Sequence, residues 1–135
     1  MIDLPKTYTM DIDKALLFIK NNNLIGIRAG SERTDFLEIW MVIVQNRIFA
    51  RSWGLAERSW YTTFLKNPVG QIKCADAIYA INAGIPEDIN LLTEEINQAY
   101  LTKYNVGQNR KYAMGIIEEK HIEKTMEFII CDIIS

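Results

Sequence analysis

The sequence predicts an α+β fold built around a small antiparallel β-barrel of six strands. The strands are predicted by segments in which apolar and polar residues alternate, and by short runs of apolar residues. Several of these segments follow one another through short turns, which favours hairpins over a doubly wound parallel sheet. The length of 135 residues and the hydrophobic content of 49% suit one core. We therefore expect a single domain over residues 1–135.

A helix and a strand are expected first. Apolar residues recur at helical spacing over 12–19, behind Asp11, whose carboxylate can cap a first turn. Residues 24–29 are typical of a strand, and Gly30 begins a turn that leads into a polar stretch.

The next two strands are expected to form a hairpin. The first covers 38–44, the most apolar strand segment of the chain, and both of its faces are predicted to be buried. The second covers 47–53 and follows a turn at Gln45 and Asn46. Alternation gives this second strand one face with Ile48, Ala50 and Ser52 and another with Phe49, Arg51 and Trp53.

After the hairpin, residues 57–66 predict a helix with Trp60 and Phe64 on one face. Two short strands, over 71–75 and 77–82, follow as a second hairpin.

The longest helix is expected from residue 86 to about residue 104. Residues 105–115 are then predicted to be a loop, and 124–132 a terminal strand. One face of the long helix carries Ile89, Leu92, Ile96, Ala99 and Lys103.

Composition argues against several classes of function. A net charge of −2 and a pI near 5.4 are unlike the basic character of nucleic-acid-binding domains. No apolar run approaches the roughly 18 residues of a membrane helix, and the first residues lack the order of a signal peptide. We therefore expect a cytoplasmic protein with neither a nucleic-acid nor a membrane partner.

The few cysteine and histidine residues give no metal motif. Because the chain has one histidine, His121, a site with several histidines is excluded, and we expect no metal. His121 lies among charged residues, which predicts a solvated position. Cys74 and Cys131 are predicted to be reduced, buried thiols, and a Cys-His catalytic pair is the alternative.

Short motifs are spread over most of the chain: Ile39-Trp40, 42–44, Arg51-Ser52, Trp60-Tyr61, 99–104 and 125–131. Together they resemble an uncharacterised bacterial family, domain of unknown function 2255, of the flavin-binding split-barrel superfamily. The resemblance implies a six-stranded antiparallel split β-barrel with flanking helices, and it also implies a homodimer.

A more distant resemblance, to deazaflavin-dependent nitroreductases, rests on Trp60, Tyr61, Leu65, Asn67 and Pro68. In that family a basic loop between the first two strands and a Ser-x-Gly turn after the third hold the cofactor. The matching positions here are 28–34, which is less basic and less rich in glycine, and 52–54.

These resemblances imply a cofactor site for FMN or a deazaflavin. Guanidinium and hydroxyl donors of the loop would bind a phosphate, and the alternative is a solvated polar turn. The implied cofactor-binding residues are Arg28, Ser31, Arg33, Thr34, Arg51, Ser52, Gly54, Trp60 and Tyr61.

Two further alternatives concern the hairpin and the helix after it. Arg51 lies on an aromatic face, so its partner is either a ligand anion or a carboxylate such as Glu38 or Glu57. The aromatic side chains near Gly54, among them Trp53, either stack on a planar ligand or pack in the core or a dimer interface.

Three functions remain open. The first is a flavin- or deazaflavin-binding oxidoreductase acting on a small molecule, in which the cofactor carries the chemistry and no side chain can be named as catalytic. The second is a non-enzymatic module of the same fold that binds a small ligand or a partner protein without flavin. An oligonucleotide-binding barrel would need a basic, aromatic surface and is the weakest of the three.

Overall fold

The computed structural model describes residues 6–30, 34–54 and 59–134, with the backbone alone over 6–10. Its elements, in chain order, are α1 (Lys6–Asn21), β1 (Ile25–Ala29), β2 (Leu37–Ile39), β3 (Val42–Val44), β4 (Arg47–Arg51), α2 (Trp60–Lys66), β5 (Val69–Cys74), β6 (Ala77–Gly84), α3 (Ile89–Tyr104), a 3-10 turn (Gly107–Asn109), α4 (Arg110–Ile116), α5 (Glu119–Ile122) and β7 (Thr125–Ile133).

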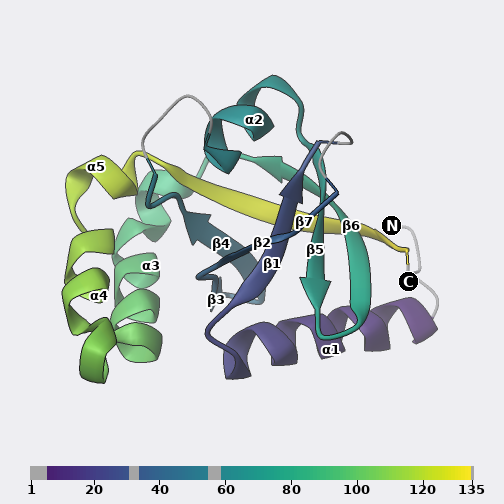
Figure 1. The fold of residues 1–135 in the computed structure, drawn as a ribbon, viewed down its shortest axis with the longest axis horizontal. Helices are drawn as coiled ribbons and strands as arrows, with labels where there is room; N and C mark the ends of the chain where they lie inside the picture. The colour runs from purple at the N-terminus through teal and green to yellow at the C-terminus, as the bar shows by residue number, and fades with distance from the viewer. Residues whose placement is uncertain (1–5, 31–33, 55–58, 135) are drawn as a thin grey trace.

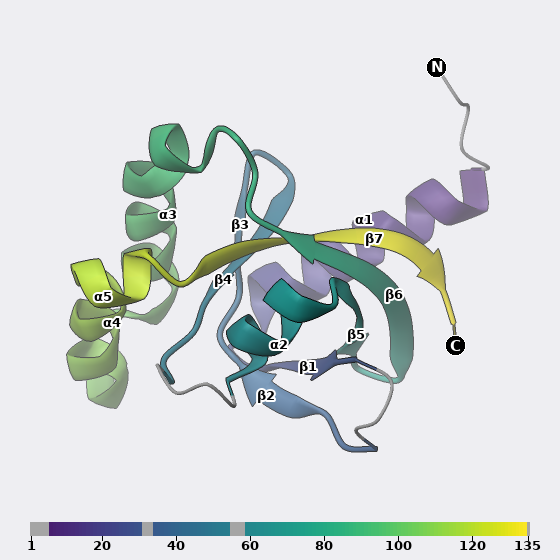
Figure 2. The ribbon, with the colours of Figure 1, turned by 90° about the horizontal axis from the view of Figure 1, so that it is seen from above.

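One antiparallel sheet joins all the described strands in the order β2-β1-β5-β6-β7-β4-β3. The sheet curls into a half-barrel, with α2 above it and α1 below it in Figure 1. Seen from above, the strands curve around α2, and α3, α4 and α5 stand together beside β3 and β4 (Figure 2). The α+β class and the antiparallel pairing are therefore confirmed. The described sheet has seven strands, so the prediction of six was wrong.

The extra strand comes from a break in the segment predicted as one strand over 38–44. β2 pairs with β1, whereas β3 pairs with β4, and the chain changes partner at Trp40 and Met41. The backbone N–H of Met41 donates to the hydroxyl of Tyr104 at 3.1 Å, and its carbonyl accepts from the amine of Lys103 at 2.7 Å. Side chains of α3 thus replace the strand partners at the break.

The hairpin of β3 and β4 closes through Gln45 and Asn46, both in the left-handed region with φ of 53° and 60°. Positive φ at both central residues is the geometry of a two-residue hairpin turn. The predicted hairpin is therefore present, although its first strand is shortened to Val42–Val44.

The prediction of a loop over 105–115 was wrong. The 3-10 turn and α4 occupy this segment, and α5 follows before β7. Gly107 has a φ of +57°, which suits a bend between α3 and α4. The first helix also begins at Lys6, ahead of the expected start at Asp11.

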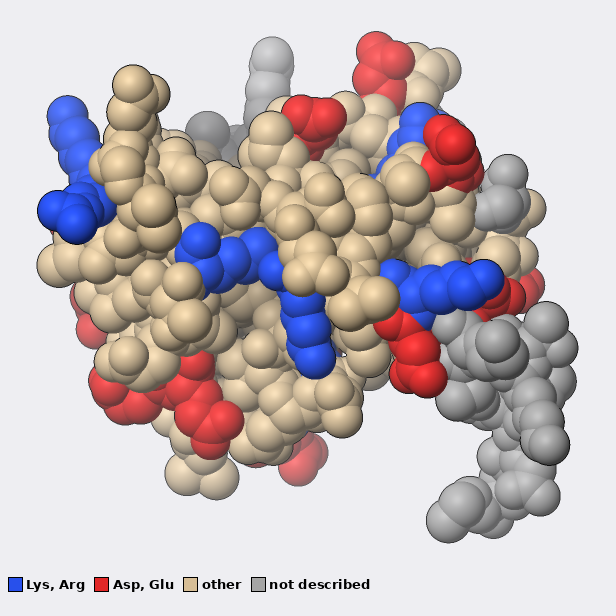
Figure 3. Space-filling model, turned by 90° about the horizontal axis from the view of Figure 1, so that it is seen from below, with Lys and Arg blue, Asp and Glu red and all other residues tan. Residues whose placement is uncertain are grey.

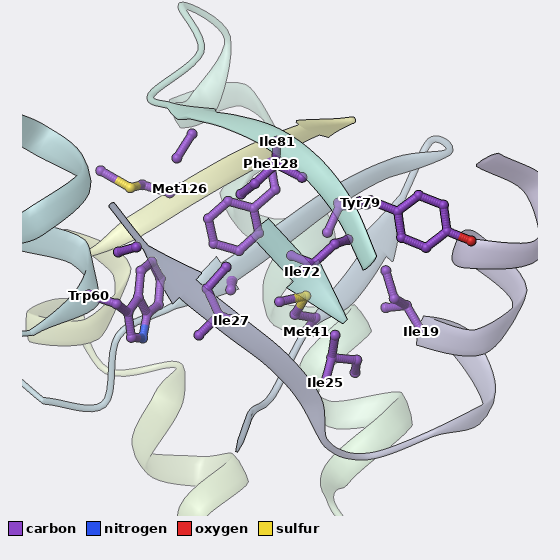
Figure 4. Packing of buried hydrophobic residues seen from close by; sticks show 14 of the residues in the cluster. Ile19, Ile25, Ile27, Met41, Trp60, Ile72, Tyr79, Ile81, Met126 and Phe128 are labelled. Carbon is purple, nitrogen blue, oxygen red and sulfur yellow. The ribbon is translucent and has the colours of Figure 1, made fainter. Parts of the chain in front are cut away.

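Two apolar clusters lie on opposite faces of the curled sheet. The inner cluster fills the half-barrel between α1 and α2, where Ile19, Ile72, Trp60 and Phe128 come together (Figure 4). The outer cluster packs β3 and β4 against α3 and α4. The alternation predicted for β4 is confirmed: Ile48 and Ala50 belong to the inner cluster, and Phe49 belongs to the outer one. The face predicted for α3 is confirmed by Leu92 and Ile96.

No helix of the described residues is long and apolar enough to cross a membrane. On the molecular face seen from below in Figure 3, Lys and Arg are interspersed with Asp and Glu and with uncharged surface.

Candidate functional site

A pocket of about 530 Å³ lies where the end of β4, β2 and the start of α2 meet α4. Its volume is within the range of small-molecule sites, roughly 300–1,000 Å³. Apolar and aromatic side chains make most of its wall. The lining residues are Leu24, Leu37, Glu38, Ile39, Trp40, Arg51, Ser52, Trp53, Gly54, Ser59, Trp60, Asn109, Tyr112 and Ile116.

The turn after β4 is held rigidly at the pocket wall. The buried Ser52 donates its backbone N–H to the carbonyl of Lys124 at 3.0 Å and its hydroxyl to the carbonyl of Gly54 at 2.6 Å. The carbonyl of Ser52 lies 2.9 Å from Nδ1 of His121. Because a carbonyl can only accept, this ring nitrogen carries the proton.

Trp53 forms an aromatic part of the pocket wall, and neighbouring side chains hold its indole in place. Its indole stacks on His121, with ring centroids 4.6 Å apart and planes 10° apart, and it meets Tyr112 edge-on at 5.6 Å. A Cβ added at Gly115 would lie 2.7 Å from the indole, so the glycine makes room for it. Trp53 as a residue is nevertheless 51% exposed, which leaves surface for a ligand.

Trp40 is a second aromatic wall, located at the break between β2 and β3. It stacks on Tyr104 with centroids 4.0 Å apart and planes 6° apart. The hydroxyl of Tyr104 in turn donates to the carbonyl of Asn23 at 2.7 Å. Burial raises the pKa of Tyr104, so that this hydroxyl keeps its proton.

Arg51 contributes a buried cation to the wall, with only 3% of its surface exposed. Its guanidinium lies 5.5 Å from the ring of Tyr100, so the predicted aromatic environment is present, although it comes from α3. Its N–H groups donate to Thr125 Oγ1 at 3.0 Å, to Asn97 Oδ1, and to the carbonyls of Ile116 and Thr93 at 3.3 and 3.4 Å.

All of these acceptors are neutral, and burial lowers the pKa of Arg51. Of the two predicted carboxylate partners, Glu38 lies on the pocket wall but forms no ion pair with Arg51, and Glu57 is outside the described residues. In the described part of the chain Arg51 therefore contributes a positive charge to the pocket wall and forms no ion pair with a carboxylate, although the charge of Glu94 acts on it from a longer distance.

Arg28 and Thr34 are the described candidate residues of the predicted phosphate loop. Arg28 donates from Nε to Gln71 at 2.8 Å and from Nη1 to the carbonyl of Thr34 at 3.0 Å, and it lies 4.3 Å from the ring of Phe36. Neither Arg28 nor Thr34 is in the pocket wall. Ser31 and Arg33 are outside the described residues. Arg28 is thus engaged within the protein.

The other predicted residues divide between the pocket and the core. Ser52, Gly54 and Trp60 line the pocket together with Arg51. Tyr61 does not line it: the side chain is buried in the inner cluster and donates to the carbonyl of Glu123 at 3.2 Å.

Two predictions on burial were wrong. His121 is 2% exposed because it is enclosed beneath Trp53 and bonded to Ser52, whereas a solvated position was expected. Cys131 is exposed, whereas Cys74 is buried as predicted. Burial raises the pKa of the Cys74 thiol to about 12, so this thiol is unreactive at neutral pH.

Sequence reasoning missed the contributions of Trp40, Asn109 and Tyr112 to the pocket. Trp40 stands in an apolar run whose pattern predicts one buried strand. The other two lie in the segment predicted as a loop. The spacing of Tyr112 and Ile116, four residues apart, is the signal that could have indicated a helix there.

Comparisons with known proteins give a family and a fold. A crystal structure of a conserved hypothetical protein from Mycobacterium tuberculosis superposes with a TM-score of 0.53 at 10% sequence identity, over 97% of this chain and 82% of that one. This likeness shows the fold alone. The sequence matches none of the curated proteins with which it was compared. The family described as uncharacterised proteins conserved in bacteria, DUF2255, matches residues 23–128, and the chain therefore belongs to that family.

Proposed function

We propose that the pocket binds a flavin or a deazaflavin and that the protein is an oxidoreductase acting on a small molecule. The observation that carries the proposal is a pocket of suitable size that contains all three tryptophans of the chain. Flat, polarisable indole rings suit a flat heteroaromatic ring. When bound, the cofactor would supply the hydride chemistry, and the protein would bind and orient it.

The place of the pocket supports this proposal. The turn from Ser52 to Gly54 lines it, and this turn matches the Ser-x-Gly turn that holds the cofactor in the deazaflavin-dependent family resembled by the sequence. The half-barrel accords with the split barrel that the resemblance implies, and the split-barrel assignment and the homodimer are parts of this proposal. On the face seen in Figure 3 charges of both signs are interspersed, and the net charge of −2 is unlike the basic character of nucleic-acid-binding domains.

The residues of the wall fit the ring of a flavin better than its phosphate. Arg51 is the cation among the described lining residues, and four hydrogen bonds already hold its guanidinium. Arg28 is bonded to Gln71 and Thr34 outside the pocket. We therefore expect the ring to supply most of the affinity.

The same observation favours a second candidate function. A pocket without a described phosphate site is also what a non-enzymatic module would have if it bound another small ligand, or a partner protein, without flavin. The two functions differ in one measurable property, which is affinity for flavins.

The test starts with the absorption spectrum of the purified protein. FMN and a deazaflavin are then titrated while tryptophan fluorescence is followed, because every tryptophan lies in the pocket wall. Bound colour, or a dissociation constant of tens of micromolar or tighter, about −6 kcal/mol, supports the proposal. Absence of both would remove the flavin function and leave the second candidate.

A pair of glycine variants locates the binding site. A Cβ added at Gly54 or at Gly84 meets no atom of the described residues within 4 Å, so both positions have room for the first carbon of a side chain, but only Gly54 lines the pocket. Gly54→Leu should weaken flavin binding about tenfold or more by occupying the pocket, whereas Gly84→Leu should leave it unchanged. Equal affinities would place the site elsewhere.

A further inference from the structure

The two exposed or half-buried tryptophans of the pocket share one structural feature. Trp40 is stacked on Tyr104, and Trp53 is stacked on His121, with planes within 10° in both pairs. The third tryptophan, Trp60, is buried and meets its aromatic neighbours edge-on. Trp40 and Trp53 therefore each contribute a flat indole to the pocket wall, and each indole is stacked on another aromatic ring.

The supporting rings are themselves fixed by hydrogen bonds to the backbone. Tyr104 bonds to Asn23 and Met41, and His121 bonds to Ser52. A tryptophan that packs on a ring held in this way is already fixed in position. It therefore loses little side-chain freedom when a ligand stacks on it, which favours binding. Among the described residues, the ring contacts of Trp53 are with His121 on one face and with Tyr112 edge-on, and the residue remains half exposed.

We propose that the flat ring of the ligand stacks on Trp40 and Trp53, so that the protein selects its ligand by a planar heteroaromatic ring and not by a phosphate. This inference rests on the proposed function, and it adds the residues that determine specificity and the part of the ligand that they recognise. Stacking on an aromatic side chain tolerates differences among ring systems, because every such ring has a π-face.

The experiment measures affinity by equilibrium dialysis, which does not depend on the tryptophans that remain. Three probes are used: FMN, riboflavin, and lumiflavin, which has the isoalloxazine ring with a methyl group in place of the ribityl chain. If the ring is recognised, all three should bind within about threefold of one another. Loss of affinity by about tenfold or more from FMN to riboflavin would overturn the proposal, because a phosphate would then dominate.

The variants separate stacking from burial of apolar surface. Trp40→Leu and Trp53→Leu keep an apolar side chain but remove the π-face, and each should weaken riboflavin binding about tenfold. Trp53→Phe should recover most of that loss. Leu37→Ala is the control, since it removes half-exposed apolar surface from the same wall without removing a ring. If Leu37→Ala weakens binding as much as the tryptophan variants do, stacking is not the cause.

The outcomes distinguish this inference from the proposed function. Flavin binding that is insensitive to Trp40→Leu and Trp53→Leu would contradict the inference and leave the flavin function standing. A planar, uncharged heteroaromatic probe that is not a flavin, phenazine, gives the converse: if it binds through both tryptophans while flavins do not bind, ring recognition holds and the flavin function fails. Absence of binding by every ring would contradict both.

Discussion

Arg51 shows how one residue can belong both to the pocket and to the stability of the fold. Its guanidinium joins β4 to β7 through Thr125 and to α3 through Asn97. We expect Arg51→Met to lower the free energy of unfolding by about 2 kcal/mol, because these acceptors lose charged donors in a buried place. Urea unfolding measures the change. A variant as stable as the wild type would mean that the desolvation of Arg51 offsets its hydrogen bonds.

Lys103 gives a prediction for the dependence of stability on pH. Its amine is partly buried against the carbonyls of Ile19 and Met41, and burial lowers its pKa from 10.5 to about 8. At pH values between about 8 and 10.5, the Lys103 amine has mostly lost its proton in the folded chain but still keeps it in the unfolded chain. Stability should therefore rise with pH from about 8 to 10.5, relative to a Lys103→Met variant.

The measurement is the difference in urea midpoints between wild type and Lys103→Met at several pH values. Taking the difference matters because Cys74 and the buried tyrosines titrate at high pH in both proteins. A difference that stays constant from pH 7.5 to about 10.5 would contradict the lowered pKa of Lys103.

At the level of residues, alternation along a strand is a local property, and it predicted one face with Arg51 and Trp53. The turn from Ser52 to Gly54 was instead implied by the resemblance to deazaflavin-dependent nitroreductases. The sequence did not predict the burial of His121. That burial depends on Trp53, which is far away in the sequence and is brought over the imidazole only when β4 pairs with β7.

Among the elements, β5 shows a position where only glycine fits. A Cβ added at Gly70 would lie 2.5 Å from the ring of Phe64 and 2.6 Å from the carbonyl oxygen of Arg28. Gly70→Ala should therefore lower the free energy of unfolding by roughly 1–3 kcal/mol, as measured by thermal or urea unfolding.

Gly84→Ala on the neighbouring strand β6 is the matched control, because a Cβ there meets none of the described atoms within 4 Å. Its stability should stay within about 0.5 kcal/mol of the wild type. Equal effects of the two substitutions would show that the loss at Gly70 reflects glycine flexibility in general and not the contact with α2.

Where element predictions failed, contacts between distant segments were responsible. The segment over 38–44 has the uninterrupted apolar character of one strand, but Tyr104 and Lys103 of α3 bind the backbone of Met41 and divide it. The segment over 105–115 contains Gly107 and Gly115, which obscured a helical pattern. In the folded chain Gly107 forms the bend, and Gly115 accommodates Trp53.

The order of the strands is a property of the whole molecule, and a single sequence does not specify it. β7, the last strand, lies between β6 and β4 and so connects the two hairpins into one curled sheet. Strand patterns indicate which segments are strands, but they do not choose the partner of each one. The helices α4 and α5 directly precede β7 in the chain, so this placement of β7 also brings α4 to the pocket.

The central claim is that the pocket between β2, the end of β4, α2 and α4 is the binding site for a planar ligand. Its most direct test is a 15N–1H NMR titration of the protein with riboflavin. We predict shifts in the indole N–H signals of Trp40, Trp53 and Trp60 and in the amides of Ser52 and Gly54, all in the pocket wall. Shifts centred instead on Arg28, Thr34 and Gln71, with the three indole signals unmoved, would contradict the claim.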